Sequence, residues 1–213
     1  MNERVSARLT LTSFDWFMLG NMLLWNAVIL FGYRWRRLEF YLYLLLVLFQ
    51  VVGMVAAWIP LRRVAIPGWV LAALQVALLL HLAGGSVFVG GTRLYDCYLV
   101  PWANLPAWAS QFFRYDKLVH AYFAAMGAAG IRAVWPRLGL GSARHPMVPA
   151  LIGLTVMGIC GLVEITEYVA TKVVHLPEVG GYDNNLQDLL ANFLGLVAAL
   201  LIMALHRPRG EAP

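Results

Sequence analysis

The sequence has few charged residues and few cysteines. Only 13% of its 213 residues are charged, against about 25% in a soluble domain, so its composition excludes an ordinary soluble protein. The two cysteines, Cys97 and Cys160, have no CxxC partner, which argues against a disulfide framework and against a zinc or redox motif. HExxH, GxSxG and P-loop motifs are also absent, so no signature of a particular reaction is present.

Hydrophobic residues are abundant instead. They make up 61% of the chain, and the mean hydropathy is +0.70. Eight Trp and nine Tyr suit a protein with aromatic belts at two membrane interfaces. The net charge of +5 comes from arginines in short loops between apolar runs, where they meet lipid headgroups. We therefore expect the lipid bilayer as a partner and no nucleic-acid partner, and the sequence leaves the oligomeric state open.

Apolar runs of membrane-spanning length recur along the chain. A helix needs about 20 apolar residues to cross the hydrocarbon core. Helices are expected because lipid offers the backbone no hydrogen-bond partners. Six segments have this length and character: 15–33, 39–59, 65–83, 117–135, 148–171 and 186–205. We predict an all-α fold, a polytopic helical bundle that forms a single integral membrane domain over residues 1–213.

Residues 84–115 differ from these six spans. The segment is apolar and aromatic, but glycine and proline interrupt it, so it cannot cross as one helix. A long structureless loop is unusual in a compact protein. We predict a surface-lying connection of short interfacial helices that covers one end of the bundle.

The basic residues indicate the orientation. With six spans, both termini share a side with the loops at 60–64 and 136–147, and this side holds nine of the sixteen Lys and Arg residues. Basic loops favour the cytoplasmic side of a membrane. We predict a multi-pass protein with both termini in the cytoplasm.

Polar residues gather at the ends of the later spans. One side of the membrane receives eight of the eleven acidic residues, because consecutive spans alternate in direction. This side carries the candidate site residues: His81 at the end of the third span, Asp116 and His120 in the fourth, Glu164 and Glu167 in the fifth, and Asp183, Asp188 and Asn192 around the start of the sixth. We expect these side chains to share a pocket near one leaflet.

The spacing of these residues supports a shared pocket. Asp116 and His120 are four residues apart and Glu164 and Glu167 are three apart, so each pair lies on one helix face. An uncompensated carboxylate in hydrocarbon costs several kcal/mol, so the two glutamates should face inward. Two carboxylates this close favour a shared proton or a bound cation.

Three interpretations of the cluster stay open. It forms a hydrogen-bonded network that locks the bundle, a catalytic or metal site, or a site for binding or proton-coupled transport. In the second interpretation Glu164, Glu167 and His120 are the catalytic residues. A divalent metal such as zinc, iron or manganese has the ligands His81, His120, Glu164 and Glu167. Asp116, Asp183, Asp188 and Asn192 form the supporting network, and the substrate is amphipathic, a lipid or an envelope precursor.

Short motifs in the second half resemble a known pattern. "YDKLVHAYFAAMGAAG", "EITEY" and "DLLANFLG" are similar to the DKxxH, ExxQ or ExxE, and DxxxNxxG motifs of the VanZ-like superfamily. "LHLAGG", the paired glutamates and the Tyr182–Asp183 pair resemble the YjdF-like family of bacterial inner-membrane proteins, whose activity is not established. The resemblance covers roughly residues 65–205. It implies a cell-envelope protein of the bacterial inner membrane and the residue set above, and it leaves open whether the protein is an enzyme.

Overall fold

The computed structural model describes residues 11–36, 40–100, 106, 110–143, 145–173 and 182–205. The predicted all-α class is confirmed, because six long helices account for most of the described residues. The helices begin and end within about five residues of the predicted spans. The chain forms two compact units, residues 1–71 and 72–213.

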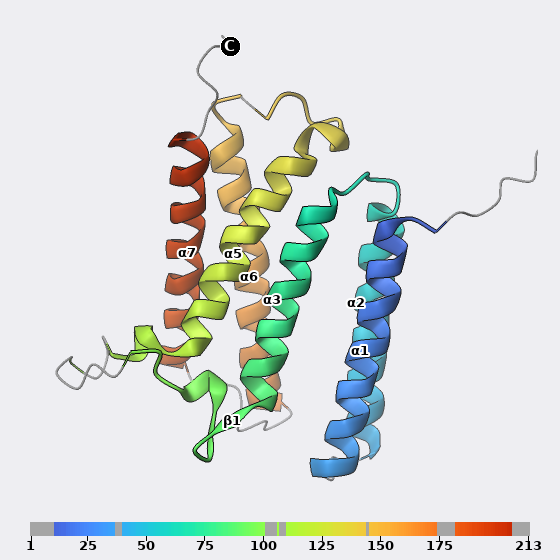
Figure 1. Ribbon diagram of the computed structural model, residues 1–213, viewed down its shortest axis with the longest axis vertical. Helices are drawn as coiled ribbons and strands as arrows, with labels where there is room; N and C mark the ends of the chain where they lie inside the picture. The colour runs from blue at the N-terminus through green and yellow to red at the C-terminus, as the bar shows by residue number, and fades with distance from the viewer. Residues whose placement is uncertain are drawn as a thin grey trace, which may run out of the picture. The chain divides into compact units, whose positions relative to one another are not determined.

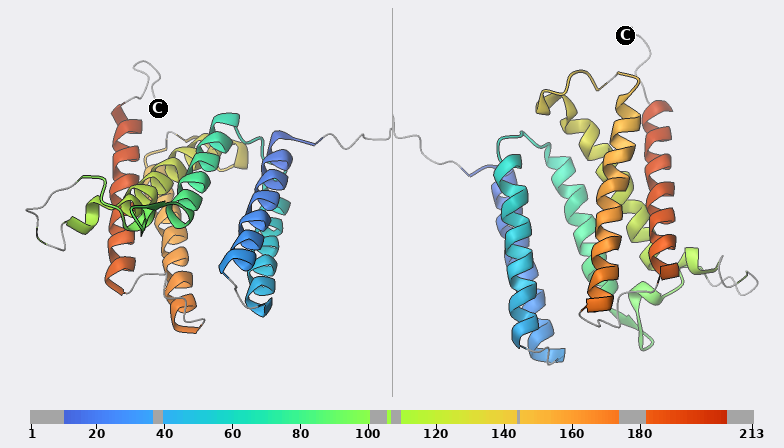
Figure 2. Two further views of the ribbon diagram at one scale, coloured as in Figure 1. Left: turned by 60° about the horizontal axis from the view of Figure 1, so that its bottom comes forward. Right: turned by 180° about the vertical axis from the view of Figure 1, so that it is seen from behind.

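The first unit is a helical hairpin. Helices α1 (Ser13–Arg36) and α2 (Phe40–Leu61) run side by side in opposite directions (Figures 1 and 2). The start of α1 is closed by a reciprocal cap: the Asp15 carboxylate accepts from the backbone N–H of Thr12, and the Thr12 hydroxyl accepts from the N–H of Asp15. The same carboxylate accepts a 2.6 Å bond from the indole Nε1–H of Trp58, which ties α2 to α1.

The second unit is built on α5 (Tyr115–Val134), α6 (Val148–Val173) and α7 (Tyr182–Leu205). Helix α5 packs closely on α7 and also contacts α6 (Figure 2). The two backbones approach closely at Gly195, where a Cβ would overlap the backbone carbonyl of Ala121. Helix α3 (Gly68–Ser86) lies against α5, and its Leu80 carbonyl accepts a 3.0 Å bond from the Tyr115 hydroxyl.

An apolar core joins α5, α6 and α7 along much of their length. Its members are nearly inaccessible to solvent, and all but Trp135, which directly follows α5, are small or branched: Ala124, Ala128, Trp135, Val148, Ile152, Val156, Cys160, Leu196 and Ala199. Small residues on α5 and α7 let the two backbones approach, as expected for helices that associate in a membrane. This core leaves the polar residues of the sequence analysis at one end of the three helices.

The connection between α3 and α5 differs in part from the prediction. It begins with a two-stranded antiparallel hairpin, β1 (Phe88–Val89) and β2 (Thr92–Arg93), where short helices were expected. Gly90 and Gly91 both have positive φ and form its two-residue turn, a backbone conformation that only glycine adopts without strain. The 3₁₀ helices η1 (Leu94–Asp96) and η2 (Gln111–Phe113) follow, and residues 101–105 and 107–109 lie outside the described chain.

Four described helical segments are long and apolar enough to cross a membrane. They are Ser13–Phe31, Gly68–Ser86, Val148–Val169 and Tyr182–Leu205. Helix α2 contributes the shorter apolar segment Val51–Leu61 among the residues searched. Helix α5 is less apolar, because Asp116, Lys117 and His120 occupy its first two turns.

Candidate polar site

The first two turns of α5 provide the centre of the polar cluster. The helix starts after Arg114, whose backbone is extended (φ −73°, ψ 150°). Asp116 in the first turn interacts favourably with the positive end of the helix dipole. His120 follows one turn later on the same face, and its Nε2 lies 3.5 Å from Oδ1 of Asp116. Local helix geometry alone therefore pairs these two side chains.

Helix α7 completes the cluster from the other side. Asp188 is 1% exposed, and its Oδ1 lies 3.5 Å from Nε2 of His120. The other oxygen, Oδ2, accepts a 2.6 Å bond from the Asn184 amide, one turn earlier on α7. Asn192, one turn later, lies with its amide nitrogen 3.3 Å from Nδ1 of His120. Asp188 and Asn192 are thus both buried on the side of α7 that faces His120.

Lys117 also belongs to the polar cluster, although it was not among the residues predicted from the sequence. Its side chain is nearly inaccessible, and the residue is 3% exposed. The ammonium donates to Oδ1 of Asp188 at 2.5 Å, to Oδ2 of Asp116 at 2.9 Å and to the Asn184 amide oxygen at 2.9 Å. The DKxxH motif could have identified it, because a lysine within a predicted span needs a buried partner of opposite charge.

Glu164 reaches His120 from α6. It is 4% exposed, and its Oε1 lies 3.6 Å from Nδ1 of His120. Asn185 of α7 donates to Oε2 at 2.8 Å and to the Glu164 backbone carbonyl at 3.1 Å. Oε1 is buried and makes no hydrogen bond with the described residues. Asn185 was not predicted, because Glu164, which it contacts, lies on a different helix.

Glu167 and Asp183, which were also predicted, differ in how they relate to this cluster. Glu167 is half-buried one turn beyond Glu164, and the charges of His120 and Asp188 act on it. Asp183 is exposed and forms no hydrogen bond or ion pair with the described residues, so the structure does not place it in the predicted network. It lies in the first turn of α7.

His81 is linked to the connection after α3. The Tyr95 hydroxyl lies 2.5 Å from Nδ1 of His81 and donates to the His81 carbonyl at 2.8 Å. The ring of Tyr95 covers Gly84, where a Cβ would overlap it. Burial raises the pKa of Tyr95, and the charges of Asp116 and Glu167 add to this effect. Tyr95 therefore closes the cluster on the α3 side as a neutral phenol.

The comparisons with known proteins identify a family. The family described as "Predicted membrane protein (DUF2238)" matches residues 14–209. The chain belongs to the DUF2238 family. No curated protein and no solved structure matches the chain. The match covers the helices from the second residue of α1 to the end of α7 and includes every member of the cluster in this DUF2238 protein, so the site lies within the family region.

The cluster of the DUF2238 protein has more negative than positive groups. Asp116, Asp188 and Glu164 face one ammonium, that of Lys117, and one imidazole. Buried charges are stable only when they are paired. One ligand atom from each of Asp116, His120 and Asp188 lies within 4.8 Å of the others, close enough to hold one metal ion. The arrangement is thus suited to taking up a cation or a proton.

Proposed function

We propose that this membrane protein binds a divalent cation between Asp116, His120 and Asp188. The supporting observation is a distance: Nε2 of His120 lies 3.5 Å from one oxygen of each aspartate. Ligands about 2.0–2.2 Å from a tetrahedral zinc ion are about 3.3–3.6 Å apart, so these three atoms match two edges of such a site. Imidazole with carboxylates suits zinc, iron or manganese.

The proposed ligands differ from those predicted from the sequence. Asp116 and Asp188 become ligands, and Glu164 becomes the group that orients the ring of His120 through Nδ1. Carboxylates commonly hold the outer nitrogen of a metal-bound histidine in this way. Glu167 and His81 then lie outside the ligand set.

The ammonium of Lys117 can take the place of a metal ion as the positive charge beside the aspartates. It contacts Oδ1 of Asp188, the same oxygen that faces His120. A cation and this ammonium therefore compete for one carboxylate oxygen. With no cation bound, Lys117 compensates the two aspartates and keeps the helices together.

Calorimetric titration of the full-length protein in lipid nanodiscs with Zn²⁺ tests the proposal. We expect one site, weakened by at least about 100-fold in Asp188→Asn. The exposed Asp183→Asn on the same helix is the matched control and should bind as the native protein does. The double variant Lys117→Met/Asp188→Asn removes both charges of the buried pair, and it should fold without binding. Equal binding by native protein and the double variant would contradict the proposal.

A proton site is a second candidate, favoured by Oε1 of Glu164. This oxygen is buried, lies beside the His120 ring and has no hydrogen bond with the described residues. A proton carried there would fit the proton-coupled transport interpretation. Proton-driven uptake that survives Glu164→Gln would exclude this function.

The kind of membrane, the substrate class and the orientation of the protein also belong to the proposal. The resemblance to YjdF-like and VanZ-like proteins supports a cell-envelope role in a bacterial inner membrane, with a lipid or an envelope precursor as the amphipathic substrate. The distribution of basic residues supports cytoplasmic termini. A metal ion would supply a Lewis acid for chemistry at a headgroup.

A further inference from the structure

The β1–β2 hairpin carries three consecutive apolar side chains that the bundle leaves uncovered. Val87, Phe88 and Val89 are 45%, 55% and 56% exposed. Successive side chains of a strand point to opposite sides, so both faces of β1 are apolar and open. The connection was predicted to cover one end of the bundle, and that role does not account for these side chains.

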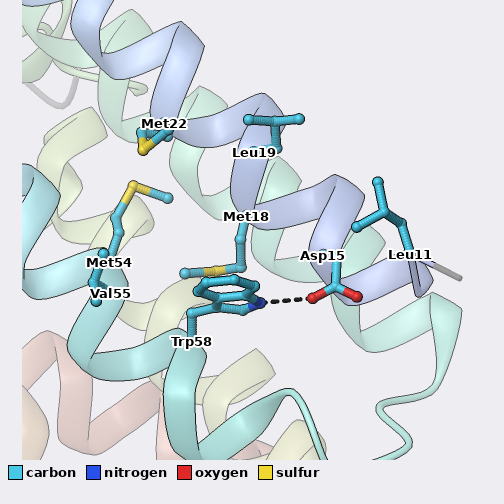
Figure 3. A pocket seen from close by; sticks show the side chains of 8 residues that line it. All are labelled: Leu11, Asp15, Met18, Leu19, Met22, Met54, Val55 and Trp58. Atoms are coloured by element: carbon cyan, nitrogen blue, oxygen red, sulfur yellow. Dashed lines mark hydrogen bonds between the residues drawn. The ribbon is translucent and has the colours of Figure 1, made fainter. Parts of the chain in front are cut away.

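Exposed apolar side chains on the long helices have a simpler explanation. A helix that crosses a membrane is covered by lipid tails, so it exposes apolar groups all round. Leu19 of α1 and Val55 of α2 line a largely apolar pocket on two such helices (Figure 3). The β1–β2 hairpin is not helical, and a two-stranded hairpin is marginally stable at best in water. It therefore needs an apolar contact of its own.

The β1–β2 hairpin lies at the end of a candidate membrane span. The span is α3 (Gly68–Ser86), and β1 begins two residues after it. The N–H of Val87 donates to the Ala83 carbonyl at 2.9 Å, and the N–H of Leu94 donates to the Val87 carbonyl at 2.8 Å. The base of the β1–β2 hairpin is thus fixed to the last turn of α3, and the hairpin projects past the end of this helix (Figure 1). This is the depth at which hydrocarbon gives way to headgroups.

Two guanidinium groups lie beside the β1–β2 hairpin. Nε of Arg93 lies 3.1 Å from Oδ2 of Asp96, and Nη1 of Arg114 lies 3.8 Å from Oδ1 of the same carboxylate. The two arginines share one acidic group, so the three side chains carry one net positive charge. The Arg114 guanidinium also lies 5.5 Å from the centre of the exposed Tyr98 ring. Arginine binds the phosphate groups of lipid headgroups, and tyrosine is typical of the same level of the membrane.

We propose that the β1–β2 hairpin inserts into the headgroup region of the leaflet on the side of the polar cluster, with Val87, Phe88 and Val89 against the upper acyl chains. The partner is membrane phospholipid, and the contact does not depend on a bound metal ion. Tyr95 follows β2, and its hydroxyl contacts Nδ1 of His81. Insertion therefore also holds the connection against the α3 side of the cluster.

Fluorescence quenching tests this contact in full-length protein reconstituted in nanodiscs of phosphatidylcholine and phosphatidylglycerol. An environment-sensitive fluorophore is attached at Phe88→Cys in a Cys97→Ser/Cys160→Ser background. Lipids with a nitroxide on the headgroup or on an upper acyl-chain carbon should quench it more strongly than aqueous iodide does. Leu162→Cys on the exposed side of α6 is the reference for a site within the hydrocarbon, where lipids labelled deeper in the chain should quench more strongly.

Two further variants separate insertion from simple proximity to the membrane. The fluorophore is moved to Thr92→Cys, which pairs with Val89 in the β1–β2 hairpin. Phe88→Ser/Val89→Ser should then reduce quenching by the upper-chain lipids at least about twofold, because less apolar surface enters the membrane. Leu138→Ser/Leu140→Ser, which changes two exposed leucines after α5, is the matched control and should leave the quenching unchanged.

Two results would overturn the proposal. Quenching by iodide with none by the nitroxide lipids would place the β1–β2 hairpin in water. Quenching by neither would mean that protein, and not lipid, covers Phe88. Asp188→Asn should leave the lipid quenching unchanged, so loss of the divalent site and loss of this contact are distinguished. A circular dichroism spectrum that matches the native protein shows that each variant is folded.

Discussion

The two ends of the α5–α7 contact hold the helices together in opposite ways. At the start of α5, Asp116, Lys117 and His120 face Asp188 through buried charges. Further along α5, apolar packing replaces charge, and Ala124 and Ala128 are fully buried. The apolar half brings the backbones together with no charge to desolvate, whereas the polar half must compensate every charge it buries. The apolar end therefore stabilises the fold without a desolvation cost, whereas the polar end holds the helices together only while its charges are paired.

Removing the Lys117 ammonium from the polar half should lower the stability of the protein more than any other change considered for these two halves. Lys117→Met leaves Asp116 and Asp188 buried together without their counter-charge. We expect the free energy of unfolding to fall by about 3–5 kcal/mol in the absence of divalent cations. Zn²⁺ should restore more stability to this variant than to the native protein, because the ion no longer competes with Lys117. Denaturant unfolding in detergent, with and without Zn²⁺, measures both effects.

The control for this variant is Lys172→Met, since Lys172 is exposed near the end of α6. It should change stability by no more than about 0.5 kcal/mol. Similar small losses in both lysine variants would contradict the buried role of Lys117.

The apolar half is tested by adding one methyl group. Gly195→Ala places a Cβ against the Ala121 carbonyl and forces α7 away from α5. We expect a loss of about 1–3 kcal/mol, measured by thermal unfolding. Gly158→Ala on α6 is the matched control, because its Cβ meets no atom within 4 Å. If both variants melt alike, the close approach at Gly195 does not hold the helices.

Tyr95→Phe tests how the cluster is closed on the α3 side. The change removes both contacts of the hydroxyl with His81, and we expect a loss of about 1 kcal/mol. The raised pKa of Tyr95 gives a second readout. Above about pH 10 the unfolded chain loses the Tyr95 proton while the folded protein keeps it, so stability falls with pH. This part of the fall should be missing in Tyr95→Phe, and identical pH curves would contradict the burial of the phenol.

The smallest effect is expected at Asp183. This carboxylate is exposed, so Asp183→Asn should alter stability by less than about 0.5 kcal/mol and leave Zn²⁺ affinity unchanged. Calorimetric titration with Zn²⁺ of Asp183→Asn and Asp188→Asn compares the two positions on the same helix. A tenfold loss of affinity in Asp183→Asn would place the predicted residue back in the network.

The helices and the clustering of polar groups could be predicted, because both follow from periodic patterns. Hydrophobic runs located all six helices, and alternating directions assigned His120, Glu164 and Asp188 to one end. The i,i+4 spacing of Asp116 and His120 fixed their common face. The Asn184–Asp188 pair has the same spacing and could have been found in the same way.

Other features could not be read from the sequence because they depend on tertiary contacts. Lys117 is adjacent to Asp116 along the chain, and only its long side chain brings it to Asp188. The bond from Asn185 to Glu164 joins two helices whose relative rotation no pattern specifies. Which nitrogen of His120 each carboxylate faces also depends on such contacts: Glu164 faces Nδ1, and Asp188 faces Nε2.

X-ray absorption at the zinc edge tests the central claim most directly. Full-length protein loaded with one equivalent of Zn²⁺ should show one imidazole nitrogen and carboxylate oxygens, all at about 2.0–2.2 Å. The imidazole signal should disappear in His120→Ala. A sulfur shell at about 2.3 Å, or an imidazole signal that persists in His120→Ala, would contradict a site formed by Asp116, His120 and Asp188.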